Sequence, residues 1–109
     1  MDSDTTKIFK KFILQFDDAS HFESIKLPVD FTLLSAELTP GVMPVLYMYG
    51  YYSERNIPFI KFNIRLIPLE AWIDPVILEN VTYFKTVSHP LGYFSYHMYW
   101  GCDLNDIQQ

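Results

Sequence analysis

The segment YMYGYYSERNIPFIKFNIRLIPLEAWID, residues 47–74, holds the densest run of β-branched and aromatic residues in the chain. Such residues favour β-strands. Turn-forming residues interrupt the run at residues 53–56 and again at residues 63–65. The segment therefore predicts three consecutive antiparallel strands around which the rest of the chain is organised: residues 44–52, 57–62 and 66–73. Tyr47, Tyr49 and Tyr51 would share one face of the first of these strands.

Further strands are predicted on both sides of this segment. Residues 31–38 have the composition of a strand, although their leucines would also fit a helix. Residues 81–87 and 93–100 read as two strands joined by a turn at residues 88–92. The result is a mostly antiparallel sheet of about five strands, an ordinary size for a sheet.

The N-terminal segment is predicted as a helix. Ser3 or Asp4 can cap it. Its apolar residues recur at helical spacing: Ile8, Phe9, Phe12, Ile13 and Phe16. Residues 19–30 carry mixed signals that fit an irregular segment or a second short helix. The predicted fold class is therefore α+β, with the N-terminal helix, and room for the short second one, packed on the sheet.

Length, aromatic content and charge set broad limits on the protein. A chain of 109 residues is expected to form a single domain, residues 1–109, with one core. The aromatic content of 17% exceeds what so small a core requires, so some tyrosine and phenylalanine side chains are expected at the surface. The net charge of -5 argues against binding to nucleic acid and favours a basic partner.

The cellular location is predicted from the cysteine and from the hydrophobic runs. Cys102 is the only cysteine, which fits a reducing compartment and gives no disulfide framework or thiolate metal cluster. No apolar run approaches the ~20 residues that span a bilayer. The start Met-Asp-Ser-Asp does not fit a signal peptide. The sequence thus predicts a cytoplasmic protein without membrane contact.

Catalytic and metal-binding patterns do not stand out. His21, His89 and His97 are scattered and lack the spacing of metal ligands. Ser53 and Ser88 lie in no nucleophile elbow, and the four glycines form neither a phosphate-binding loop nor a dinucleotide fingerprint. The chain is therefore predicted not to be an enzyme, and to need no metal, cofactor or small-molecule substrate.

Acidic residues stand beside the aromatic strands. Any one of them is more often a solvated surface residue than part of a site. As a group, carboxylates on a rigid scaffold can imitate the phosphates of DNA, which recur every ~3.4 Å per strand. The candidate phosphate mimics are Asp17, Asp18, Glu23, Asp30 and Glu54, with Glu70, Asp74 and Glu79 as a weaker set.

Several short motifs follow one another along the chain. They are Leu27-Pro28 with Phe31, Leu34, Ala36 and Leu38, then Tyr51-Tyr52-Ser53-Glu54, Ile57-Pro58-Phe59-Ile60, Trp72-Ile73-Asp74 and residues 83–91 (YFKTVSHPL). In this order, across residues 23–100, they resemble the staphylococcal uracil-DNA glycosylase inhibitor family. One departure is that Ser24-Ile25 runs straight into Lys26-Leu27-Pro28, without the acid-rich second helix of that family.

The resemblance implies a protein inhibitor of uracil-DNA glycosylase that mimics DNA and occupies the DNA-binding cleft of that enzyme. Acidic residues would take the phosphate sites, and an apolar pocket would capture the leucine with which the enzyme opens DNA. Carried over by position, Glu23 and Glu54 match acids of the family, and Asp17, Asp18 and Asp30 would replace the missing charge. The residues assigned to the pocket or its rim are Tyr47, Met48, Phe59, Lys85, Val87 and His89.

Two other functions stay open. One is an acidic immunity or antitoxin-like module that neutralises another basic enzyme. The other is a small structural or ligand-binding domain that uses an aromatic sheet face.

Overall fold

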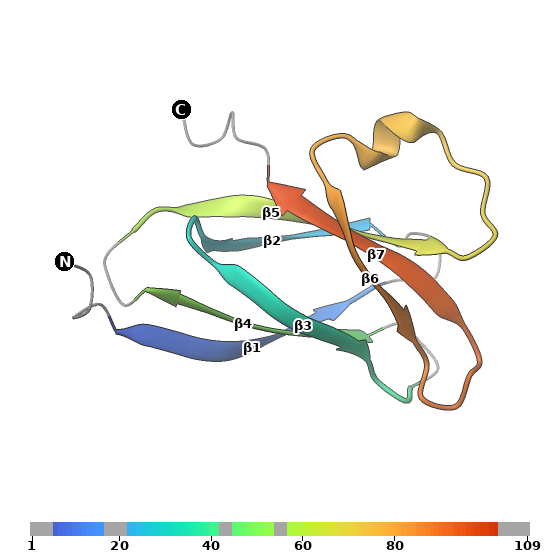
Figure 1. Cartoon of the computed structure of the whole chain (residues 1–109), viewed down its shortest axis with the longest axis horizontal. Coiled ribbons are helices and arrows are strands. Elements are labelled where there is room, and N and C mark those ends of the chain that lie inside the picture. The colour runs from blue at the N-terminus through green and yellow to red at the C-terminus, as the bar shows by residue number, and fades with distance from the viewer. Residues whose placement is uncertain (1–5, 17–21, 42–44, 54–56, 103–109) are drawn as a thin grey trace.

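The structure, a computed structural model, describes residues 6–16, 22–41, 45–53 and 57–102, which form two antiparallel β-sheets (Figure 1). Sheet A has the strand order β1-β4-β3 and sheet B the order β2-β5-β7-β6. The elements of the described residues are β1 (Lys7–Gln15), β2 (Phe22–Pro28), β3 (Thr32–Leu38), β4 (Val45–Ser53), β5 (Phe59–Pro68), a 3-10 helix η1 (Pro75–Leu78), β6 (Thr82–Ser88) and β7 (Ser95–Cys102). None of the helical structure in these residues is long and apolar enough to cross a membrane.

The predicted N-terminal helix is wrong, because this segment is strand β1 and pairs with β4 along its whole length. The apolar residues of the expected helical stripe divide between the two faces of the strand. Phe12 and Phe16 turn toward the core, whereas Phe9 is 69% exposed and Ile13 is 56% exposed on the outer face. Residues four positions apart lie on one side of a helix and also on one side of a strand. This spacing therefore could not decide between a helix and a strand.

The prediction of an α+β fold is wrong, because the regular structure of the described residues is nearly all strand. The segment that left room for a second helix contains β2, which pairs with β5. The expected turn at residues 63–65 lies within β5, which is unbroken from Phe59 to Pro68. Asn63 pairs with Ser24 of β2 on one side and with Gly101 of β7 on the other. Pairing on both sides overrides the weak turn preference of this asparagine.

Four other strand predictions are confirmed. The segments 31–38, 44–52, 81–87 and 93–100 correspond to β3, β4, β6 and β7, with ends that differ by a few positions. Each of these segments combines turn residues at its ends with β-branched or aromatic residues inside, so local sequence and tertiary pairing agree there.

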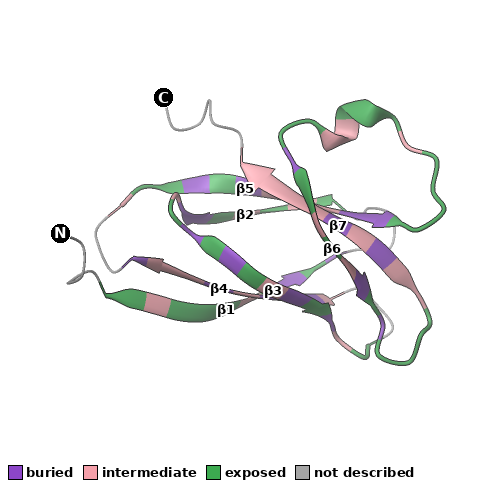
Figure 2. Cartoon of the chain, viewed as in Figure 1, coloured by how far each residue is buried: buried purple, intermediate pink, exposed green. Residues whose placement is uncertain are grey.

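The two sheets face each other across one hydrophobic core. Along β4, the buried Leu46 and Met48 alternate with the half-buried Tyr47 and Tyr49, and Figure 2 shows such alternation along the strands. Phe31 links the sheets, because its ring meets Trp100 of β7 edge-on at a centroid distance of 6.0 Å. The buried core residues are Leu14, Phe16, Leu27, Phe31, Leu33, Ala36, Leu38, Leu46, Met48, Ile60, Phe62, Ile64, Leu66, Val87, Tyr96 and Met98.

Candidate binding face

The outer face of sheet A carries three tyrosines in a row. Tyr47, Tyr49 and Tyr51 alternate with buried residues along β4, so all three point away from the core. β1 adds the exposed Phe9 and Ile13, which lie opposite Tyr51 and Tyr47 in the strand register. We name this surface the tyrosine face; its members are Lys7, Phe9, Lys11, Ile13, Leu34, Tyr47, Tyr49 and Tyr51.

Lysines from β1 lie over the aromatic rings of β4. Lys11 Nζ is 4.6 Å from the ring centroid of Tyr47, and Lys7 Nζ is 5.6 Å from that of Tyr51. The ring of Phe9 packs against Tyr51 at a centroid distance of 5.3 Å. A cation over an exposed ring contributes about 0.5–1 kcal/mol. These contacts hold positive charge on an otherwise apolar surface.

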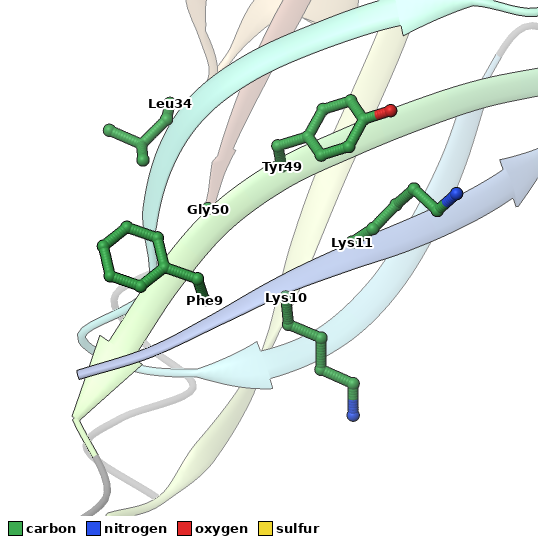
Figure 3. Close-up of a pocket in the computed structure, with 6 residues that line it drawn as sticks. All are labelled: Phe9, Lys10, Lys11, Leu34, Tyr49 and Gly50. Carbon is green, nitrogen blue, oxygen red and sulfur yellow. The ribbon is translucent and has the colours of Figure 1, made fainter. Parts of the chain in front are cut away.

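A shallow depression of about 250 Å³ lies within the tyrosine face (Figure 3). Phe9 and Leu34 stand on either side of Gly50, and Tyr49 and Lys11 continue the surface, while Lys10 points away from them (Figure 3). The walls are mostly apolar. The depression is therefore an apolar recess with a cation beside it.

An irregularity in β3 places Leu34 at this recess. Leu33 pairs with Gly50 and Ser35 pairs with Tyr49, so Leu34 is an extra residue in the ladder. Such a β-bulge re-aims the side chain of the inserted residue. Leu34 is half exposed as a result and forms one wall of the depression.

One acidic residue borders the tyrosine face. The hydroxyl of Tyr49 donates a hydrogen bond to Glu37 Oε1 at 3.2 Å. Partial desolvation raises the pKa of Tyr49, and the hydrogen bond and the negative charge of Glu37 act in the same direction. The phenol of Tyr49 is therefore neutral at physiological pH and is fixed in orientation by Glu37.

The residues that the sequence assigned to an apolar pocket do not come together in one recess. Met48 and Val87 are buried in the core between the sheets. Tyr47 belongs to the tyrosine face, where Lys11 covers its ring. Phe59 is exposed at the start of β5, and Lys85 is exposed on β6.

His89, the sixth of these residues, is buried in the turn between β6 and β7. Its Nε2 donates to the carbonyl oxygen of Gly41 at 3.0 Å, and its Nδ1 accepts from the Leu91 N–H at 3.0 Å. The rings of Tyr93 and Phe94 pack against the imidazole at centroid distances of 4.7 and 4.9 Å. This arrangement fits the neutral imidazole and makes His89 a tie between the two sheets.

The candidate phosphate mimics are only partly placed. Asp17, Asp18 and Glu54 lie outside the described residues. Asp30 follows the end of β2, and its Oδ2 accepts a hydrogen bond from the Ser53 N–H at 3.2 Å. Glu23 lies near the other end of β2. A strand rises ~3.3 Å per residue, so Glu23 is about 17 Å from Pro28, the end of β2 that Asp30 follows. The structure therefore does not bring Glu23 and Asp30 together.

The outer face of sheet B carries a polar cluster that the sequence did not indicate. Thr86 Oγ1 lies 2.8 Å from the hydroxyl of Tyr83 and 3.0 Å from His97 Nδ1. The ring of Tyr83 also meets Tyr99 of the neighbouring strand at 5.7 Å. The three hydrogen-bonding side chains lie on adjacent strands and orient one another. In the sequence, the polar residues at alternate positions of β7 are the signal that could have suggested this cluster.

Arg65 lies on the same side of sheet B. Its guanidinium carbon is 4.9 Å from the ring centroid of Phe22, and Nη1 donates to the Ile64 carbonyl oxygen at 3.3 Å. Burial lowers the pKa of Arg65. Among the described residues, no group of three or more histidine, cysteine or acidic side chains could hold a metal ion.

Comparison of the chain with protein-family models, with curated protein sequences and with solved structures gives no match.

Proposed function

We propose that this protein is a protein-binding module whose tyrosine face holds an acidic segment with a large apolar side chain. The observation that carries the proposal is the apolar depression between Phe9 and Leu34 with Lys11 beside it. An apolar side chain of the partner segment would fill the depression, and the carboxylates of the same segment would approach the lysines of β1.

The exposure of large apolar side chains supports a contact surface. Phe9, Ile13 and Leu34 are each at least half exposed on one side of one sheet, next to the rings of β4. A contiguous apolar patch is costly to leave in water and commonly marks an interaction site. Tyrosine is also enriched at interfaces, since it offers a large rigid ring with one polar tip.

The charge of the tyrosine face supports an acidic partner segment. Lys7 and Lys11 are held over tyrosine rings, so their ammonium groups stay close to the apolar surface. Opposite charge on a partner would speed its association and fix its orientation. Glu37 at the border would disfavour acidic groups there and help to set the register.

Single-stranded nucleic acid is the main alternative, because bases also stack on aromatic residues beside cations. A single strand carries a phosphate on every nucleotide, whereas a peptide with a few acids can place neutral residues beside Glu37. Glu37 and the net charge of -5 therefore disfavour the single strand more strongly than a protein segment.

Inhibition of uracil-DNA glycosylase remains a prediction of the sequence resemblance. Its direct test is the excision of uracil from an oligonucleotide with the purified protein in excess. Full excision under these conditions would dismiss it. We also infer a cytoplasmic location, since the single thiol of Cys102 suits a reducing compartment.

The proposed binding mode can be tested by a titration that follows the backbone amide signals in NMR spectra. The probe is a synthetic peptide with one tryptophan between acidic residues, and the control peptide has lysines in place of the acids. Only the acidic peptide should bind, and the shifted signals should belong to β1, β3 and β4. Shifts confined to sheet B, equal binding of both peptides, or tight binding of a single-stranded oligonucleotide would contradict the proposal.

Variants sharpen this experiment. Phe9→Ala and Leu34→Ala each remove one wall of the depression, and both should weaken binding of the acidic peptide by about tenfold, a typical loss at the centre of an interface. Phe59→Ala is the matched control, because it removes an exposed aromatic ring outside the tyrosine face. Equal binding by all three variants would exclude the depression as the site.

A further inference from the structure

The loop between β5 and β6, residues 69–81, exposes an unusual set of apolar side chains. Trp72 is fully exposed at 101%, and Leu69 and Val76 are half exposed. Exposure of a tryptophan ring to water is unfavourable in free energy, and tryptophan is among the residues that most often dominate the binding energy of an interface. The loop therefore has the features of a segment that inserts a side chain into a recess of a partner.

Hydrogen bonds fix the shape of this loop. Asp74 Oδ1 accepts from the Val76 N–H at 3.1 Å, and the Asp74 carbonyl oxygen accepts from the Ile77 N–H at 3.0 Å, which caps and starts η1. On the other side of Trp72, the Ala71 N–H donates to the Pro68 carbonyl oxygen at 3.2 Å. A loop that already holds its bound shape loses less conformational entropy on docking.

The charge of the loop is opposite to that of the tyrosine face. Glu70, Asp74 and Glu79 are exposed in it, and its sequence from Pro68 to Asn80 contains no lysine or arginine. The depression on the tyrosine face has Lys11 beside it. The chain thus carries both an acidic loop with a protruding apolar ring and an apolar recess with a basic border.

We propose that Trp72 of one copy of this protein docks in the depression on the tyrosine face of a second copy. This inference rests on the proposed function and names the partner of that face. Figure 1 shows the loop at the upper right of the molecule, whereas β1 and β4 of sheet A lie at the lower left. The contact is therefore head-to-tail, and it leaves one free loop and one free face to extend the assembly.

Sedimentation of the full chain over a range of concentrations tests the contact. The average mass of the parent should rise with concentration and fall with added salt, because exposed charges are screened. Trp72→Ala should weaken self-association by at least about tenfold, whereas the control Phe59→Ala should not. Both side chains are exposed, so both variants should keep the fold, which circular dichroism can verify. A monomeric parent, or association that Trp72→Ala leaves unchanged, would overturn the inference.

A charge exchange identifies the two surfaces. Lys7→Glu with Lys11→Glu reverses the tyrosine face, and Glu70→Lys with Glu79→Lys reverses the loop while leaving the Asp74 cap intact. Each double variant alone should associate less than the parent. An equimolar mixture of the two should recover association, because the reversed face of one variant meets the reversed loop of the other, and the unchanged loop of the first meets the unchanged face of the second. A mixture as weakly associated as its components would place the contact elsewhere.

The peptide titration separates this inference from the proposed function. If the acidic peptide binds the tyrosine face while the full chain stays monomeric, the partner is another protein and only the present inference falls. If neither the peptide nor a second copy binds there, both fall together.

Discussion

His89 Nε2 donates a hydrogen bond to the carbonyl oxygen of Gly41 at 3.0 Å, and this bond connects the β6–β7 turn to the segment between β3 and β4. The two strand pairs belong to different sheets, so one buried side chain joins the sheets at the end of the sandwich. The Leu91 N–H satisfies the other ring nitrogen. His89 therefore helps to hold β3 in place, and β3 is one of the three strands that form the tyrosine face.

Replacing His89 should destabilise the fold considerably. His89→Ala leaves the Gly41 carbonyl and the Leu91 N–H without their partner and opens a cavity beside Phe94, so we expect a loss of about 2–4 kcal/mol in the free energy of unfolding. Urea denaturation measures it. His97→Ala, at a half-buried histidine of β7, is the control and should cost less. Equal losses would show that the bridge adds nothing.

The same substitution at two adjacent residues of β1 should lower the stability of the fold by very different amounts. Leu14 is buried and Ile13 is 56% exposed, so Leu14→Ala should cost about 2–5 kcal/mol and Ile13→Ala less than about 1 kcal/mol. A helix with the spacing described from the sequence would reverse this order, since it would bury Ile13. Thermal or urea unfolding of the two variants decides between them.

Local sequence is sufficient for part of this fold because some patterns have one interpretation. The alternation along β4 predicts a strand with Tyr47, Tyr49 and Tyr51 on one face, and the structure has this arrangement. The segment of β1 has two interpretations, since its apolar spacing fits either period. The pairing of β1 with β4 decides, and it joins parts of the chain that are far apart in sequence.

The candidate site was predictable to a similar extent. The tyrosines of β4 could be assigned to one face, but Phe9 and Leu34 could not be placed beside them from sequence. Phe9 reaches Tyr51 through the β1–β4 register, and Leu34 reaches the depression through a bulge in β3. Register and bulges depend on tertiary pairing, for which a single sequence gives little signal.

Gly50 should be intolerant of any side chain. An added Cβ would collide with the ring of Phe31 and with the carbonyl oxygen of Thr32, and the backbone oxygen cannot move without disturbing the β3–β4 ladder. Gly50→Ala should therefore cost about 3 kcal/mol or prevent folding. Gly92→Ala is the control: its surroundings are open, and only its positive φ of 81° penalises alanine, by about 1–2 kcal/mol. Unfolding curves that rank Gly92→Ala as the more damaging change would contradict this packing.

Alkaline pH should weaken the fold through Tyr96. Burial raises the pKa of Tyr96 above its ordinary value of about 10, so the folded state favours the neutral phenol. Its contribution to stability is therefore fully present below about pH 10 and is lost as the pH rises from there through the raised pKa of the folded state. Urea unfolding between pH 8 and pH 11 measures the decline, and Tyr96→Phe should reduce it, because phenylalanine does not ionise. An unchanged decline in Tyr96→Phe would assign the effect to other tyrosines, of which Tyr49 also has a raised pKa.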